Sequence, residues 1–238
     1  MIILSAAKIA LLFDLDNTLI EIKDTHNHFD SIIIEVLKKK GLPIPALEDR
    51  NQLWRNVDYK ELLGSWGCQD PDDFWRLFDE IDFVKRKRRH DEKKIVLFDD
   101  VEDVLDELER NENVILGLIS NTSPPIVNFE LELFGLKQYF PYIIALGDNQ
   151  EQCKPSEYGV RYLIDKIRQN ETIADDEIYI LGDSTTDIGA GINAGIQTVF
   201  INRRGKRKEQ IQPEPDYILD SLSEIFEILG DKIGIDEK

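Results

Sequence analysis

The strongest constraint on the fold is a series of short apolar runs that are separated by amphipathic segments. The runs lie at Lys8–Phe13, Val114–Ile119, Tyr142–Leu146, Glu177–Leu181, Thr198–Ile201 and Tyr217–Leu219. A strand that is buried on both faces has such a near-continuous apolar sequence, because neither face meets water. Amphipathic segments at Val101–Leu108, Tyr158–Ile167 and Leu222–Leu229 predict helices. Strands that alternate with helices predict an α/β fold, with a parallel sheet between two layers of helices.

One long segment, Ile22–Lys94, interrupts this alternation after the first strand. The apolar residues of 32–37 recur at helical spacing, and further helices are predicted over Asp49–Leu63 and Asp72–Phe83. No clear strand pattern occurs between them. We therefore predict two domains, an α/β core formed by residues 1–21 and 95–238 and an all-helical insertion formed by residues 22–94.

Polar residues follow several of the predicted strands at the point where each strand ends. The first strand leads into Asp14–Thr18, the second into Ser120–Thr122, and a later one into Gly182–Asp187, while Cys153–Pro155 opens a helical segment. The carboxyl ends of parallel strands meet at one edge of a sheet, where such folds bind their ligands. We therefore expect carboxylates, hydroxyls and one lysine to gather in a single site.

Converging carboxylates of this kind have a specific chemistry. Several of them cannot all stay ionised in a shared site without a cation. Oxygen ligands suit Mg²⁺, which often keeps some of its waters and binds a substrate phosphate oxygen. An ionised aspartate is also a competent nucleophile for phosphoryl transfer, and a second acid can protonate the leaving group. The pattern therefore predicts metal-assisted phosphoryl chemistry.

Charge and composition exclude several other functions. The chain has 29 basic and 47 acidic residues, a formal net charge of −18 at pH 7, which repels polyphosphate backbones and argues against nucleic acid as a partner. No window reaches the ~18 apolar residues of a membrane span, so no membrane partner is expected. The two cysteines, Cys68 and Cys153, form no disulfide framework, which favours a reducing, cytoplasmic location. We expect a monomer or a weak homodimer.

The four polar segments resemble the four motifs of the haloacid dehalogenase superfamily of hydrolases. Phe13–Leu19 (FDLDNTL) resembles the first motif, Ser120–Thr122 the second, Lys154-Pro155 the third and Gly182–Asp187 (GDSTTD) the fourth. Connecting segments such as 193–203 are similar as well. The resemblance implies a Rossmann-like core with a helical cap inserted between the first and second motifs, and a substrate site between core and cap.

The resemblance also implies catalytic roles for three residues. Asp14 is expected to be the nucleophile and one Mg²⁺ ligand. Asp16 is expected to be the general acid and base, with its backbone carbonyl also on the metal. Lys154 is expected to stabilise the nucleophile and the transferring phosphate.

Five further residues receive supporting roles from the resemblance. Thr18, Ser120 and Asn121 are expected around the substrate: Thr18 fixes the first loop, Ser120 hydrogen-bonds the phosphoryl group and the backbone near Asn121 assists. Asp183 is expected to be a metal ligand. Asp187 is expected to support the metal shell, directly or through water.

The acid at Asp16 favours phosphate esters over haloacids, because no alkoxide leaves when a carbon–halogen bond is cleaved. We therefore expect a Mg²⁺-dependent phosphohydrolase that cleaves a small phosphorylated metabolite through an aspartyl-phosphate on Asp14. A sugar-phosphate mutase has the same motifs and is an alternative. A non-catalytic domain that binds a partner is a second alternative, although all motif residues are present.

Two basic runs and two tryptophans complete the predictions. Lys85–His90 (KRKRRH) is interpreted as a solvated helix face or a linker between the domains. Arg203–Lys208 (RRGKRK) follows a predicted strand, so it is the better candidate for contact with substrate, a solvated loop being the alternative. Trp54 and Trp75 are expected in the small core of the insertion.

Overall fold

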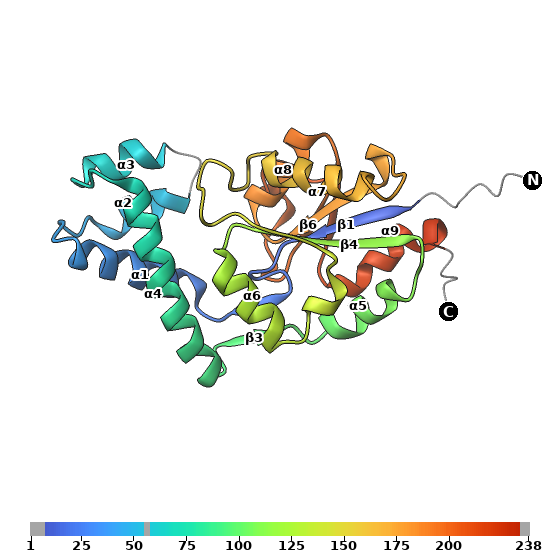
Figure 1. Cartoon of the computed structure of the whole chain (residues 1–238), viewed down its shortest axis with the longest axis horizontal. Helices are drawn as coiled ribbons and strands as arrows, with labels where there is room; N and C mark the ends of the chain where they lie inside the picture. The colour runs from blue at the N-terminus through green and yellow to red at the C-terminus, as the bar shows by residue number, and fades with distance from the viewer. Residues whose placement is uncertain (1–7, 55–57, 234–238) are drawn as a thin grey trace, which may run out of the picture. The chain divides into compact units, whose positions relative to one another are not determined.

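The structure is a computed structural model that describes residues 8–54 and 58–233. It divides into two compact units, one formed by residues 1–21 and 97–238 and the other by residues 22–96. The first unit contains a six-stranded sheet of order β5-β4-β1-β6-β7-β8, in which every neighbouring pair is parallel (Figure 1). The predicted α/β class with a parallel sheet and a helical insertion is confirmed.

The elements of the first unit follow the predicted alternation. Its strands are β1 (Ile9–Phe13), β4 (Val114–Ser120), β5 (Tyr142–Ala145), β6 (Ile178–Gly182), β7 (Gln197–Ile201) and β8 (Tyr217–Leu219). Its helices are α5 (Val101–Glu109), α6 (Pro124–Leu133), α7 (Tyr158–Arg168), α8 (Thr185–Ala194) and α9 (Ile225–Ile233). Short 3₁₀ helices lie at η2 (Lys137–Tyr139), η3 (Asp175–Glu177), η4 (Lys208–Gln210) and η5 (Leu222–Glu224).

Strand β1 occupies the middle of the sheet and is buried along its whole length. Its alternate residues point to opposite faces, so Ala10 and Leu12 pack in one cluster with Leu163 of α7 and Ala190 of α8. Helices α5 and α9 lie on the opposite face (Figure 1). Burial on both faces explains why this strand has a continuous apolar sequence.

The strand order decides which loops become neighbours. Strand β1 pairs with β4 on one side and with β6 on the other, all three in the same direction. The loops that leave the carboxyl ends of these three strands therefore lie beside one another. These are the loops that carry the first, second and fourth of the polar segments identified in the sequence.

The second unit is helical, apart from short strands at its ends. Its helices are α1 (Thr25–Lys39), α2 (Leu47–Arg50), α3 (Tyr59–Ser65) and α4 (Pro71–Asp91), with a 3₁₀ helix, η1 (Asn51–Trp54), between α2 and α3. The two-stranded ribbon β2 (Ile20–Ile22) and β3 (Ile95–Leu97) lies where the chain passes between the units. The second unit has an apolar core of its own, which includes Ile33, Leu37, Phe74 and Phe78.

The helix predicted over Asp49–Leu63 is wrong. The described residues form α2, η1 and α3 instead, and residues 55–57 lie outside them. The Asp58 side chain accepts hydrogen bonds from the backbone N–H groups of Lys60 and Glu61, at 2.9 and 3.2 Å, so a new helix begins there. The expectation for the tryptophans holds for Trp75, which is 7% exposed, but not for Trp54, which is 43% exposed.

The interpretation of Lys85–His90 as a solvated helix face also needs correction. Arg86 is completely buried, and its Nε donates to Asp82 Oδ2 at 3.0 Å, one turn earlier on α4. The other oxygen of Asp82 lies 2.8 Å from His28 Nε2 of α1. One member of the basic run therefore belongs to the interior of the insertion.

Among residues 8–54 and 58–233, no helix has the length and apolar sequence that crossing a membrane requires.

Candidate active site

The loop that follows β1 forms a tight turn around Asp14. The Asp14 N–H donates to Leu181 O of β6 at 2.8 Å, and the N–H groups of Leu19 and Ile20 both donate to Leu15 O at 3.0 Å. Within this turn, Thr18 Oγ1 donates to Asp14 Oδ2 at 3.1 Å. Asp14 is 7% exposed. The turn therefore holds the carboxylate in one orientation at the carboxyl end of the central strand.

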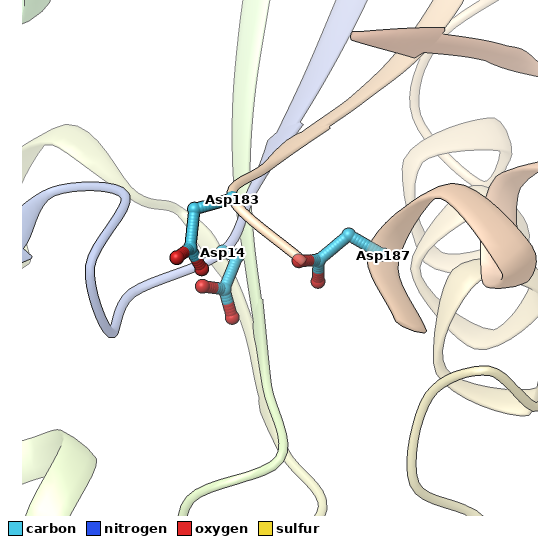
Figure 2. Close-up of side chains that lie close together, drawn as sticks. All are labelled: Asp14, Asp183 and Asp187. Carbon is cyan, nitrogen blue, oxygen red and sulfur yellow. The ribbon is translucent and has the colours of Figure 1, made fainter. Parts of the chain in front are cut away.

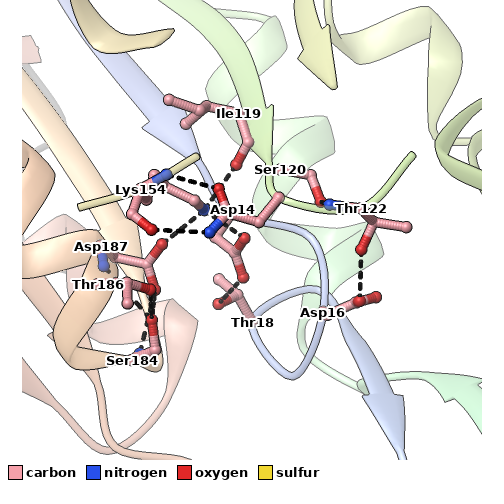
Figure 3. Close-up of polar contacts among 11 residues, drawn as sticks. Asp14, Asp16, Thr18, Ile119, Ser120, Thr122, Lys154, Ser184, Thr186 and Asp187 are labelled. Carbon is pink, nitrogen blue, oxygen red and sulfur yellow. Dashed lines mark hydrogen bonds and ion pairs between the residues drawn. The ribbon is translucent and has the colours of Figure 1, made fainter. Parts of the chain in front are cut away.

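Lys154 is the positive centre of the site and is fully engaged. Its Nζ lies 2.6 Å from Asp14 Oδ1, 2.6 Å from Asp187 Oδ1 and 2.9 Å from Ile119 O (Figure 3). The contacts with Asp14 and Ile119 are hydrogen bonds, and the contact with Asp187 is an ion pair. Burial acts to lower the pKa of Lys154, but the negative charges of Asp14 and Asp187 outweigh it and raise that pKa. The lysine therefore stays charged.

The backbone of Lys154 is fixed by the side chain of Asn121. The Lys154 N–H donates to Asn121 Oδ1 at 2.7 Å, and Asn121 Nδ2 donates to Lys154 O at 2.9 Å. Both ends of the amide are thus used to join the loop after β4 to the lysine. The expected role of the backbone near Asn121 in substrate binding stays a prediction, but the side chain itself holds the lysine.

Asp187 is placed by the first turn of α8. Its Oδ2 accepts from the Ser184 N–H at 3.1 Å and from Ser184 Oγ at 2.5 Å, while Ser184 Oγ accepts from the Asp187 N–H at 3.4 Å. This reciprocal arrangement is a capping box. It leaves Oδ1 for Lys154. Gly182 makes room for the carboxyl group, since a Cβ at that position would lie 2.2 Å from Asp187 Cγ.

Asp183 completes a cluster of three carboxyl groups. One oxygen from each of Asp14, Asp183 and Asp187 lies within 4.8 Å of the others. In Figure 2, the carboxyl groups of Asp14 and Asp183 lie next to each other, and Asp187 points toward them from α8. Burial raises the pKa of Asp183 to about 7, and the charge of Asp187 adds to this effect. Burial also raises the pKa of Asp14 well above its ordinary value; the charge of Lys154 opposes this, whereas Asp187 and Asp183 reinforce it.

The donor set fits a small divalent cation. Three carboxylates share one lysine, so the cluster has an excess of negative charge that a cation would neutralise. Ligands at about 2.1 Å from Mg²⁺ are separated by up to about 4.2 Å, close to the spacing of these oxygens. The choice of Asp14 and Asp183 as direct ligands, with Asp187 in support, stays a prediction of the sequence.

Asp16 lies apart from the three clustered carboxylates and makes a separate contact. Thr122 Oγ1 donates to Asp16 Oδ2 at 2.8 Å, joining the loop after β4 to the loop after β1 (Figure 3). The Thr122 N–H donates to Ser120 Oγ at 3.1 Å, and Ser120 is buried. Thr122 stands inside the second motif, but sequence reasoning gave it no role, because the pattern does not say which carboxylate its hydroxyl meets.

Arg203 differs from the solvated or substrate-binding residue expected of its basic run. Its side chain is 8% exposed, and its guanidinium donates to Asp100 Oδ2 at 2.7 Å and to Thr18 O at 3.1 Å. It also lies over the ring of Phe98. Arg203 therefore supports the turn that contains Asp14, and no sequence signal separated it from the cations that follow it.

The structure thus brings most of the predicted site residues to one edge of the sheet. Direct contacts join Asp14, Thr18, Asn121, Lys154 and Asp187. Asp183 lies beside them, and Asp16 and Ser120 are linked through Thr122. The capping box could have been expected from the spacing of Ser184 and Asp187 ahead of a helix. The two hydrogen bonds between the Asn121 side chain and the Lys154 backbone could not have been expected, because the two residues are distant in sequence.

Comparison with known proteins gives a consistent result. Residues 11–201 match the model of a family described as haloacid dehalogenase-like hydrolase. The pyrophosphatase PpaX of Bacillus velezensis is 27% identical over 229 residues, which cover 94% of this chain and 97% of that protein.

Solved structures share the fold. CbbY from Rhodobacter sphaeroides, solved in complex with phosphate, has a TM-score of 0.69 and 23% identity, covering 96% of this chain and 100% of that one. The HAD-hydrolase YfnB from Bacillus subtilis, bound to magnesium, has a TM-score of 0.56 and 21% identity, covering 94% and 99%. With the family model matching most of its length, the chain belongs to the haloacid dehalogenase-like hydrolases.

Proposed function

We propose that this protein is a Mg²⁺-dependent phosphohydrolase that cleaves a small phosphomonoester through an aspartyl-phosphate on Asp14. The observation that carries the proposal is the set of contacts that holds the Asp14 carboxylate in place. Each of its carboxyl oxygens accepts one hydrogen bond, from Lys154 and from Thr18, and two further carboxylates lie beside it. A nucleophile held in one orientation needs little reorganisation before it attacks.

In the first half-reaction, an Asp14 oxygen attacks phosphorus and the bond from phosphorus to the ester oxygen breaks. The leaving oxygen takes a proton from the carboxyl group of Asp16, so an alcohol leaves and Asp16 becomes a carboxylate. Thr122 holds Asp16 in place through its hydroxyl group. Lys154 stabilises the negative charge shared by Asp14 and the transferring phosphoryl group.

In the second half-reaction, water attacks the phosphorus of the aspartyl-phosphate. Asp16 takes a proton from this water, the bond from phosphorus to the Asp14 oxygen breaks, and orthophosphate leaves. Both carboxyl groups then return to their starting states. One acid can serve both steps because the proton it gives up in the first is returned in the second.

Asp14 and Asp183 are the proposed direct ligands of the metal, with the backbone carbonyl of Asp16 as a third and Asp187 in support. When bound, Mg²⁺ neutralises charge on the carboxylates and on the phosphoryl oxygens. Magnesium in the related YfnB structure supports this choice of ion.

A small phosphorylated compound is the proposed substrate. The name of the relative PpaX describes a pyrophosphatase, which acts on a small phosphoanhydride. The assignment of residues 22–94 as the cap of the α/β core stays a prediction of the sequence.

Phosphate release from a panel of small phosphomonoesters, with and without Mg²⁺, tests the proposal. The wild type and Asp165→Asn, which changes an exposed acid on α7, should release phosphate only with the metal. Asp14→Asn should release none while keeping the wild-type melting temperature. Phosphate release at the wild-type rate by Asp14→Asn would overturn the proposal, and conversion of a sugar phosphate to its isomer without free phosphate would point to a mutase.

A further inference from the structure

The loop that follows β7 is a closed turn held by Asn202. The Asn202 side chain accepts from the Lys206 N–H at 2.7 Å and donates to Lys206 O at 3.1 Å and to Asp220 Oδ1 at 3.1 Å. Inside the turn, the Gly205 N–H donates to Asn202 O at 3.1 Å, and Gly205 has a φ of 60°, which favours glycine. The backbone of this loop is therefore fixed, although the side chains after Arg203 are exposed.

This fixed loop concentrates positive charge in an acidic protein. Five of the six residues of Arg203–Lys208 are basic, whereas the whole chain has a net charge of −18. Arg203 forms an ion pair with Asp100. The next two cations of the turn, Arg204 and Lys206, are exposed. Lys206 also lies over the ring of Phe200, which limits the positions of its ammonium group.

The same loop adjoins the carboxylate cluster. A shallow recess with about 150 Å³ of empty space, partly open to solvent, is lined by Asp183, Arg204 and Lys206 together with Phe200–Arg203. Burial raises the pKa of Asp183, and the positive charges of Arg204 and Lys206 act in the opposite direction. The recess is too narrow to enclose a ligand, so an anion would lie at its mouth, between the two cations and the solvent.

We propose that Arg204 and Lys206 form a subsite for a second anionic group of the substrate, so that the enzyme prefers phosphate esters whose leaving group carries a carboxylate, or phosphoanhydrides whose leaving group is itself a phosphate. This inference rests on the proposed function and names its substrate class. Asp183 belongs both to the recess and to the cluster around Asp14, so the second anion lies close to the phosphorus. The favoured substrates are therefore short.

The two cations are suited to this task. The fork of an arginine binds two oxygens of a carboxylate or a phosphate at once, and a lysine adds a point charge. The alternative role for these residues is to reduce the excess negative charge around Asp183. Such an effect would change kcat/KM for every substrate by the same factor. A subsite would change kcat/KM only for substrates that carry the second charge.

Three probe compounds separate these roles. Phosphoglycolate carries a carboxylate on its leaving group, pyrophosphate carries a second phosphate, and 2-hydroxyethyl phosphate is similar in size to phosphoglycolate but has a neutral leaving group. The wild type should have a higher kcat/KM for at least one of the two charged compounds than for the neutral one. The better charged compound then identifies whether the second anion is a carboxylate or a phosphate.

The test variant is Arg204→Gln/Lys206→Gln, and the matched control is Lys208→Gln. Lys208 lies on the same basic run, is exposed and does not line the recess. In the double variant, kcat/KM for the preferred charged compound should fall about tenfold or more, as expected from the loss of charge-assisted hydrogen bonds. The value for 2-hydroxyethyl phosphate should change less than about threefold, and Lys208→Gln should resemble the wild type.

Calorimetric binding of the same compounds to Asp14→Asn protein, with and without the double substitution, gives a readout that does not need turnover. Equal loss for charged and neutral compounds in both measurements would overturn the subsite, and so would a wild type without preference. If the wild type released no phosphate from any compound, the proposed function would fail. If the charged compounds still bound in a way that depended on Arg204 and Lys206, these residues would form an anion site that serves another function.

Discussion

Two buried clusters of charged side chains, one in each unit, differ in how their charges balance. In the insertion, the single carboxylate of Asp82 lies between two basic side chains, with Arg86 Nε at 3.0 Å and His28 Nε2 at 2.8 Å. In the α/β unit, three carboxylates lie together and Lys154 is the cation that contacts two of them. Both clusters are buried, but among these contacts the basic side chains outnumber the carboxylate in the first, whereas the carboxylates outnumber the lysine in the second.

The difference separates a structural cluster from a functional one. A buried carboxylate with matched partners stabilises a fold mainly because breaking the pair leaves an unpaired charge behind. A cluster with charge in excess destabilises the fold until a ligand neutralises it, which is typical of functional sites. Burial is the largest cause of the raised pKa of Asp183, about 7, and of Asp14, and the neighbouring carboxylates add to both shifts. The following predictions test the contrast.

The largest expected effect is on activity. Asp14→Asn removes the proposed nucleophile and should lower kcat by a factor on the order of 10³ or more. Its free energy of unfolding should be equal to or higher than that of the wild type, because one of the three clustered carboxylates becomes neutral. Steady-state rates and chemical denaturation measure the two quantities. An active variant, or one that is clearly less stable than the wild type, would contradict the contrast.

The reverse result is expected in the insertion. Asp82→Asn removes the buried negative charge that contacts Arg86 Nε and His28 Nε2, which should destabilise the protein by about 3–5 kcal/mol. Asp72→Asn, an exposed acid on the same helix, is the control and should change stability by less than about 0.5 kcal/mol. Denaturant unfolding of both variants measures the effect. A loss as small as that of the control would show that the Asp82 cluster does not stabilise the insertion.

Metal binding should stabilise the protein through the cluster with excess charge. At about 100 times its Kd, Mg²⁺ should raise the free energy of unfolding by about 2.7 kcal/mol, and a chelator should reverse this. Asp183→Asn should lose most of the effect, and Asp165→Asn should keep it. Thermal melts over a Mg²⁺ titration provide the measurement. A full shift in Asp183→Asn would place the metal elsewhere.

The smallest effect concerns the position of Asp16, the proposed general acid. Thr122→Val removes the hydroxyl group that binds Asp16 and should lower kcat for alkyl esters about tenfold. Aryl phosphates need less protonation of their leaving oxygen and should be affected less, and Thr122→Ser should restore the rate. Equal loss for both ester types, or no rescue by serine, would mean that Thr122 has only a structural role.

The sequence was most informative where local pattern decides structure. Buried strands such as β1 and β4 have continuous apolar sequences, and parallel strands place their following loops at one edge, so the gathering of Asp14, Lys154 and Asp183 was predictable. The capping of α8 by Ser184 follows from spacing alone. These features depend on residues that are near in sequence or on the direction of strands.

The features that were missed depend on partners that are far apart in the chain. Thr122 meets Asp16 across 106 positions, and Arg203 meets Thr18 across 185. Arg86 pairs with Asp82 one turn away on the same helix, but the other partner of that carboxylate, His28, lies 54 positions away. Residue type and periodicity contain no information on such pairings, because the side chain that satisfies a buried polar group is chosen by the fold.

The most direct test of the central claim is a search for the covalent phosphoenzyme. Wild-type protein and Asp14→Asn would be mixed with a phosphorus-labelled substrate and Mg²⁺, quenched in acid within one turnover and digested, and the labelled peptide identified. Label is expected on the peptide that contains Asp14 in the wild type, and no label is expected in the variant. Product formation without labelled protein, or label that persists in Asp14→Asn, would contradict the assignment of Asp14 as the nucleophile.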